Sequence, residues 1–229
     1  MNRRTFLQKS SLIIPGLGAG ALWAGLPGKL MAEEAKQASF SLSVVTDQPD
    51  KAIVMIQHLL SRIHQGQKNI NYSEYVLHGT HVADIVYTQA GQLVDFYRKA
   101  GPVNAALRGI ANELNLPKSC DNPVLCHFSI SDGISKPKGF RIFRDNALIM
   151  EKAFPGKTET IIVDGIKGRL VLEAAADHTV SFVETSCTHK TCMSMGKISQ
   201  PGQNLVCVPN GISVAIAGQR VSGVDSITF

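Results

Sequence analysis

The chain has 229 residues, of which 44% are hydrophobic and 18% are charged, so it is long enough to bury one large core or two small ones. Its formal net charge is +5, but four basic residues and no acidic residue lie within the first 32 positions. The remainder of the chain therefore carries a net charge of only +1. This near-neutral balance argues against nucleic acid as a partner.

The first 32 residues have the pattern of a twin-arginine export signal. The pair Arg3 and Arg4 precedes a run without charge from Ser10 to Gly28. We predict a signal over 1–32 that directs the protein to the periplasm or to the outer face of the cytoplasmic membrane. The uncharged run is also about as long as a bilayer requires, so contact with the membrane is expected only if the signal is not cleaved.

Residues 40–130 alternate between strand and helix patterns. Strands are predicted over 40–47 and 69–79, and helices over 49–66, 89–100 and 102–114. This order predicts a small α/β domain with a parallel pair of strands. The proline-bearing stretch 116–126 is predicted to be a loop, which a short disulfide between Cys120 and Cys126 could close.

Two resemblances within this first domain point in different directions. "HGTHVA" (78–83) resembles the histidine motif of subtilisin-like proteases, but the serine motif G-T-S-M-A of that family does not occur in the chain. His78 and His81 are therefore interpreted as loop histidines, and the lack of a complete catalytic set favours a binding protein over an enzyme. The strand that ends in "VLHG" resembles the DsrE-like sulfur-relay proteins over about 40–130, which implies a sulfur-carrier thiol at Cys120.

From about Phe140 onward the chain consists of short β-like runs separated by glycine turns, of which Asp164–Gly165 and Asn210–Gly211 are the clearest. This pattern predicts an all-β domain over 140–229, with the domain boundary in the Gly-, Ser-, Pro- and Lys-rich stretch 131–139. The expected fold class is α+β, with a small α/β domain followed by an all-β, barrel-like domain.

A specific series of motifs lies within this second domain. Ser186–Cys187 is followed by Cys192, then by "GKISQPGQ" (196–203), and then by V-C-V-P-N at Val206–Asn210. This series resembles the NusG domain II family over about 141–218. The resemblance implies a β-barrel-like module that occurs in exported or membrane-tethered proteins, and it implies no particular reaction or cofactor.

All five cysteines follow the predicted signal. An exported protein meets an oxidising compartment, which favours disulfides, and an odd count leaves at least one thiol free, metal-bound or paired to another chain. We predict that three of the sulfur atoms meet in space at the lip of the β domain. The disulfide candidates are Cys120, Cys126, Cys187, Cys192 and Cys207, and the last three are the ones expected to meet.

A metal centre is the alternative to a disulfide. Cys187-Thr188-His189 resembles the first ligand loop of Rieske proteins, whose second loop would need a histidine where this chain has Asn210. Cys187, His189 and Cys207 are therefore the predicted ligands of a variant iron–sulfur centre or of a single metal ion.

The sequence as a whole predicts an exported binding or accessory protein of the cell envelope with a cysteine-stapled β domain. Its expected partner is another envelope protein or a redox complex. An electron-transfer protein with a metal centre at Cys187, His189 and Cys207 is the first alternative, and a sulfur-carrier thiol protein is the second.

Overall fold

The structure is a computed structural model that describes residues 40–63, 70–130 and 135–220. The predicted signal and the last β-like run, 221–229, lie outside the described residues. The first half contains β1 (Phe40–Thr46), α3 (Pro49–Ile63), β2 (Ile70–Val76), β3 (Thr80–Ala83), β4 (Ile85–Gln89), β5 (Gln92–Leu93), α4 (Pro102–Glu113), β6 (Lys118–Asp121) and β7 (Val124–Ile130). The second half contains β8 (Ser135–Arg144), β9 (Ala147–Ala153), β10 (Glu159–Asp164), β11 (Arg169–Ala174), β12 (Val180–Thr185), η1 (Thr191–Met195), β13 (Asn204–Cys207), η2 (Val208–Asn210) and β14 (Ile212–Arg220).

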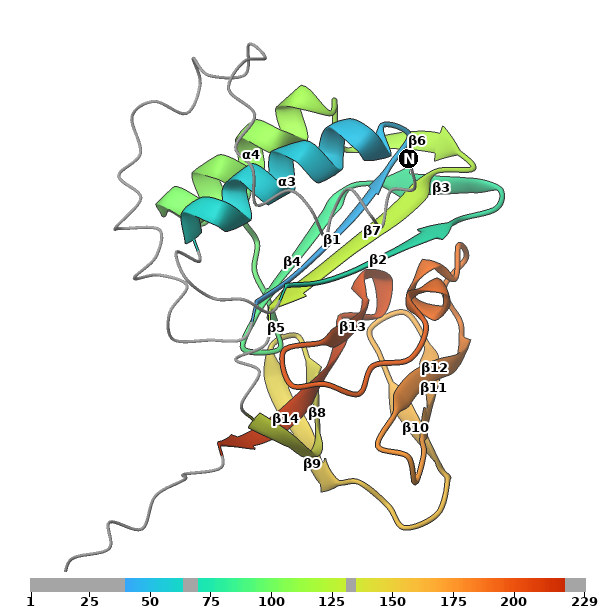
Figure 1. The fold of residues 1–229 in the computed structure, drawn as a ribbon. Coiled ribbons are helices and arrows are strands. Elements are labelled where there is room, and N and C mark those ends of the chain that lie inside the picture. The colour runs from blue at the N-terminus through green and yellow to red at the C-terminus, as the bar shows by residue number, and fades with distance from the viewer. Residues whose placement is uncertain (1–39, 64–69, 131–134, 221–229) are drawn as a thin grey trace, which may run out of the picture.

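A five-stranded sheet of order β2-β7-β1-β4-β5 forms the centre of the first half, and α3 and α4 lie together on one of its faces (Figure 1). The paired residues Leu42, Tyr87 and Phe128 point to the same face of the sheet and are almost fully buried. Both helices present apolar residues at helical spacing to this core, as the sequence predicts. Pro102 begins α4, where its missing amide proton costs nothing.

Three local predictions for this half are wrong. Residues 89–100 do not form a helix, because Ala90 and Gly91 adopt positive φ angles of 53° and 82° and turn the chain back into β5. The stretch 116–126 is not a loop, because Asn122 and Pro123 suffice for the turn and the flanking residues extend into β6 and β7.

The predicted parallel pair is also wrong. β1 lies between β4 and β7 and is antiparallel to both of them. The two strands predicted to pair, β1 and β2, are joined by the crossover helix α3 and run in the same direction, but β7 lies between them and pairs antiparallel with each.

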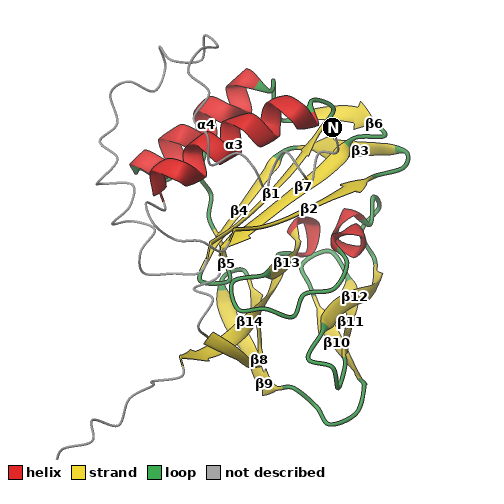
Figure 2. Ribbon diagram, viewed as in Figure 1, coloured by secondary structure: helices red, strands yellow, loops and turns green. Residues whose placement is uncertain are grey.

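The second half is built from antiparallel sheets of order β13-β14-β8-β9 and β10-β11-β12. Figure 2 shows strands throughout this half, with η1 and η2 between them and the five-stranded sheet. The predicted Asp164–Gly165 turn joins β10 to β11, and Gly211, with a φ of 62°, leads from η2 into β14. The α+β class is therefore confirmed, with a helix-bearing half followed by a β-rich half. No helix in the described ranges is long and apolar enough to cross a membrane.

The second face of the five-stranded sheet carries a group of buried polar side chains beside the apolar Val45 and Leu125. We call its members the polar seam; they are Ser41, Ser43, Thr88, His127, Ser129 and, from β13, Asn204. The Asn204 amide donates a hydrogen bond to the Thr88 hydroxyl over 3.1 Å, and the Ser213 hydroxyl of β14 donates to the Gly91 carbonyl over 2.5 Å. The two halves of the chain are thus joined by directional polar contacts as well as by apolar packing.

Candidate functional site

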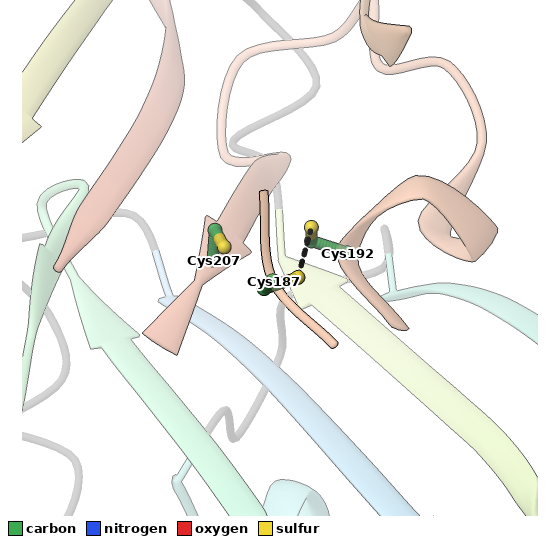
Figure 3. A group of neighbouring side chains, drawn as sticks. All are labelled: Cys187, Cys192 and Cys207. Carbon is green, nitrogen blue, oxygen red and sulfur yellow. Dashed lines mark hydrogen bonds between the residues drawn. The ribbon is translucent and has the colours of Figure 1, made fainter. Parts of the chain in front are cut away.

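Three cysteines from separate elements of the β-rich half meet at one point (Figure 3). Cys187 lies in the loop after β12, Cys192 lies in η1, and Cys207 is the last residue of β13. Their sulfur atoms all lie within 4.8 Å of one another, and the Sγ atoms of Cys187 and Cys192 are 3.9 Å apart. The prediction that these three sulfur atoms meet is confirmed. We call this group the three-cysteine cluster.

The end of β12 positions Cys187. The Cys187 amide donates to the Thr185 hydroxyl over 3.3 Å, and the preceding Ser186 amide donates to the Arg169 carbonyl over 3.0 Å. A Cβ atom on Gly168 would lie only 2.2 Å from the Ser186 hydroxyl oxygen, so the β10–β11 connection packs directly on this loop. Backbone hydrogen bonds and close packing against Gly168 therefore both hold this loop in place.

Asn210 holds the other side of the cluster. It is fully buried, and its Nδ2 donates to the Cys207 sulfur over 3.3 Å. Its carbonyl accepts a hydrogen bond from the Ile166 amide over 3.0 Å, and a Cβ atom on Gly165 would lie 2.5 Å from its own Cβ. The Pro-Asn motif after Cys207 thus supplies a hydrogen-bond donor to sulfur, and the Asp-Gly turn of the β10–β11 connection keeps that donor in place.

The cluster favours a thiolate at Cys207. The neighbouring Cys192 thiol lowers the pKa of Cys207 to about 5, the Asn210 amide and the Thr185 hydroxyl act in the same direction, and burial opposes them. The same pairing with Cys207, together with burial, raises the pKa of Cys192. The pairing of the two buried sulfur atoms thus favours ionisation of the Cys207 thiol over that of the Cys192 thiol.

His189 lies in the segment between Cys187 and η1 but is not one of the three residues that form the cluster. Its ring packs against the His81 ring, with 5.6 Å between the ring centroids. The ligand set of Cys187, His189 and Cys207 stays a prediction, and the sulfur that completes the observed group belongs to Cys192.

His81 connects the first half of the chain to the cluster. Its Nε2 lies 3.0 Å from the His78 carbonyl oxygen, so this nitrogen carries the proton, and its Nδ1 accepts a hydrogen bond from the Thr191 hydroxyl at 2.9 Å. Because Thr191 begins η1, this contact anchors the turn that carries Cys192. Sequence reasoning missed this role, since nothing local in "HGTHVA" indicates a partner 110 positions away.

The remaining two cysteines lie away from the cluster. Cys120 is on β6, opposite His81 on β3, and burial raises the pKa of its thiol. Cys126 is fully buried on β7. All five cysteines are free thiols in the structure, so the disulfide assignments stay predictions. A buried thiol with a raised pKa is a poor nucleophile, which disfavours Cys120 as a sulfur carrier.

Residues 124–220 match the family model of NusG domain II. The C-terminal part of the chain is a NusG domain II-like module. The match begins in β7, earlier than the predicted span of 141–218, and it includes the three-cysteine cluster. A search of curated proteins finds no match for the chain.

Solved structures that resemble this chain match about a third of it. They include the Lin0431 protein from Listeria innocua, with 22% identity, a TM-score of 0.32, and coverage of 34% of this chain and 92% of that one. They also include DUF1312 family proteins from Ruminococcus gnavus, with 23% identity, a TM-score of 0.31 and coverage of 35% and 97%, and from Enterococcus faecalis, with 20% identity, a TM-score of 0.32 and coverage of 34% and 94%.

The cluster in the NusG domain II-like module permits two kinds of sulfur chemistry. Two of the thiols can form a disulfide and leave the third free, or all three can bind a soft metal ion. A Rieske ligand set is not assembled here, because that centre takes two histidines on one iron, whereas Asn210 directs its amide N–H at the Cys207 sulfur.

Proposed function

We propose that the protein is an exported accessory protein of the cell envelope whose NusG domain II-like module binds a thiophilic metal ion through Cys187, Cys192 and Cys207. The observation that supports this proposal is the convergence of three sulfur atoms within 4.8 Å. The export pattern at the N-terminus supports the location, and the lack of a complete catalytic set in the sequence supports an accessory role.

The spacing of the sulfur atoms matches that of metal ligands. A tetrahedral ion with bonds of about 2.3 Å to sulfur places its ligands roughly 3.8 Å apart, and the Cys187 and Cys192 sulfur atoms are 3.9 Å apart. A disulfide would require about 2.05 Å. The cluster therefore suits an ion without rearrangement of the backbone, whereas a disulfide requires the sulfur atoms to move together.

The charge balance of the site supports the same conclusion. Cys192 and Cys207 are 4% and 1% exposed, so an additional negative charge on either sulfur has little water to stabilise it. A cation bound between the three sulfur atoms would allow all of them to ionise, because it places a positive charge in direct contact with each thiolate. Without a bound cation, the cluster avoids burying three thiolates by keeping some of its thiols protonated.

The test is metal binding by the full chain, purified without oxygen after reduction and titrated with Cd²⁺, whose thiolate complexes absorb in the ultraviolet. Wild-type protein should bind one ion per chain. Cys207→Ser and Cys192→Ser should abolish the absorption, and Cys120→Ser, which lies outside the cluster, should bind as the wild type does. Binding that survives both cluster substitutions, or no binding by the wild type, would overturn the proposal.

A cysteine staple is the second candidate, and the short separation of Cys187 and Cys192, five positions apart in the chain with their sulfur atoms 3.9 Å apart, favours it. A two-electron oxidant of the envelope compartment would join their sulfur atoms with release of two protons, and the Cys207 side chain would remain outside the disulfide. Mass spectrometry of non-reduced protein from the envelope distinguishes the two states. A quantitative Cys187–Cys192 disulfide supports the staple, and three free thiols with bound metal support the metal centre.

A further inference from the structure

We infer that the ion taken by the three-cysteine cluster is Cu(I), bound by three sulfur atoms without a fourth protein ligand, and that Cys187 is the ligand through which it is exchanged. This inference rests on the proposed metal-binding function and names the ion.

The first argument is the number of ligands. In the part of the chain that the structure describes, the group consists of three cysteines and includes no histidine, aspartate or glutamate. Structural zinc sites are almost always four-coordinate, with all four ligands supplied by the protein. A d¹⁰ monovalent ion such as Cu(I) is stable with three thiolates, so the observed set is complete for Cu(I) and one ligand short of a structural Zn²⁺ site.

The imidazoles of His81 and His189 do not supply the fourth ligand that a structural Zn²⁺ site would need. Both ring nitrogens of His81 are occupied, one by the Thr191 hydroxyl and one by the His78 carbonyl. His189 is exposed and packs its ring against His81. The site therefore presents sulfur alone, which is the donor type that a soft ion prefers.

The polar groups around the cluster are hydrogen-bond donors rather than ligands. The Asn210 amide N–H donates to the Cys207 sulfur, and the Thr185 hydroxyl lies 3.8 Å from the same atom. Three thiolates around a monovalent ion carry two net negative charges, and these donors stabilise part of that charge. The Asn210 amide oxygen has no hydrogen-bond partner among the described residues, but an amide oxygen is a hard donor that suits Cu(I) poorly.

Exposure identifies the exchangeable ligand. Cys192 and Cys207 are buried, whereas Cys187 is half-buried. An incoming thiolate from a partner can bond to the copper as the bond from copper to the Cys187 sulfur breaks. The freed Cys187 thiolate then takes a proton from solvent, and no electron is transferred. The ion is therefore cargo that enters and leaves at Cys187.

X-ray absorption spectroscopy on the full chain tests the coordination. Protein loaded anaerobically with one equivalent of Cu(I) should show three sulfur neighbours at about 2.3 Å and no nitrogen or oxygen neighbour. Zn²⁺ should bind weakly and be removed by EDTA, and His189→Ala should leave the binding of both ions unchanged.

The outcomes separate this inference from the function on which it rests. Zn²⁺ that resists EDTA in the wild type but not in His189→Ala would overturn the inference, because it would identify His189 as a fourth ligand, yet it would leave the metal-binding function intact. Failure of both ions to bind would overturn the function itself. For exchange, Cys187→Ser leaves Cu(I) with two sulfur ligands and an open position on the half-buried side of the site, so a competing thiol chelator should remove the ion faster than from the wild type. An unchanged rate would contradict the assigned role of Cys187.

Discussion

His127 on β7 connects the pH of the solution to the stability of the fold. It belongs to the polar seam, where its Nδ1 lies 2.8 Å from the Ser43 hydroxyl, and its Nε2 has no hydrogen-bond partner among the described residues. Burial lowers its pKa from 6.5 to about 4. The folded protein therefore keeps His127 neutral in a pH range where the unfolded chain protonates it.

The sign and the size of the effect follow from this difference. Above pH 6.5 the histidine is neutral in both states, so its contribution to stability is fully present. As the pH falls from 6.5 towards 4, the unfolded state takes up a proton that the folded state does not, and the free energy of unfolding decreases. At 1.36 kcal/mol per pKa unit, the whole window corresponds to about 3 kcal/mol, of which about 2 kcal/mol is lost between pH 7.5 and pH 5.

Urea unfolding followed by circular dichroism at pH 7.5 and pH 5 measures this loss. His127→Gln keeps a polar group that can reach Ser43 but has no proton to gain, so its stability should fall by about 2 kcal/mol less than that of the wild type over this range. His78→Gln is the control, because the His78 side chain is exposed. Equal pH dependence in the wild type and His127→Gln would refute the reasoning, as would an equally reduced dependence in His78→Gln.

Three further substitutions test the surroundings of the cluster. Asn210→Asp removes the amide donor that lies 3.3 Å from the Cys207 sulfur and puts a carboxylate in its place; metal affinity in a chelator competition should fall roughly 10- to 100-fold, and an unchanged affinity would exclude a role for the donor. Thr191→Val keeps the shape of the side chain but removes its hydrogen bond to β3; it should cost about 1 kcal/mol of stability in urea and speed alkylation of the cluster thiols. Gly165→Ala places a Cβ 2.5 Å from that of Asn210 and should lower the free energy of unfolding by about 1–3 kcal/mol, measured by thermal unfolding. Gly156→Ala is the control, because its Cβ would have no atom within 4 Å and would cause no such clash.

Local patterns in the sequence sufficed for much of the fold and for most of the site. The helical spacing of apolar residues identified α3 and α4, and the glycine turns identified the β-rich half, because both signals depend on neighbours within a few residues. The motifs from Ser186 to Asn210 identified the NusG domain II-like module and the convergence of its three cysteines. The helix predicted over 89–100 failed because the left-handed φ angles at Ala90 and Gly91 override the helical pattern.

Tertiary structure alone decided the partners across long separations. Alternation of polar and apolar residues predicts a strand but does not show which strands become its neighbours. The antiparallel pairing of β1 with β4 and β7 therefore could not be predicted from the sequence. The contact between His81 and Thr191 joins residues 110 positions apart, and that between Thr88 and Asn204 joins residues 116 positions apart. Periodicity reports which face of an element is buried, whereas the identity of the group that meets that face depends on how the two halves of the chain pack.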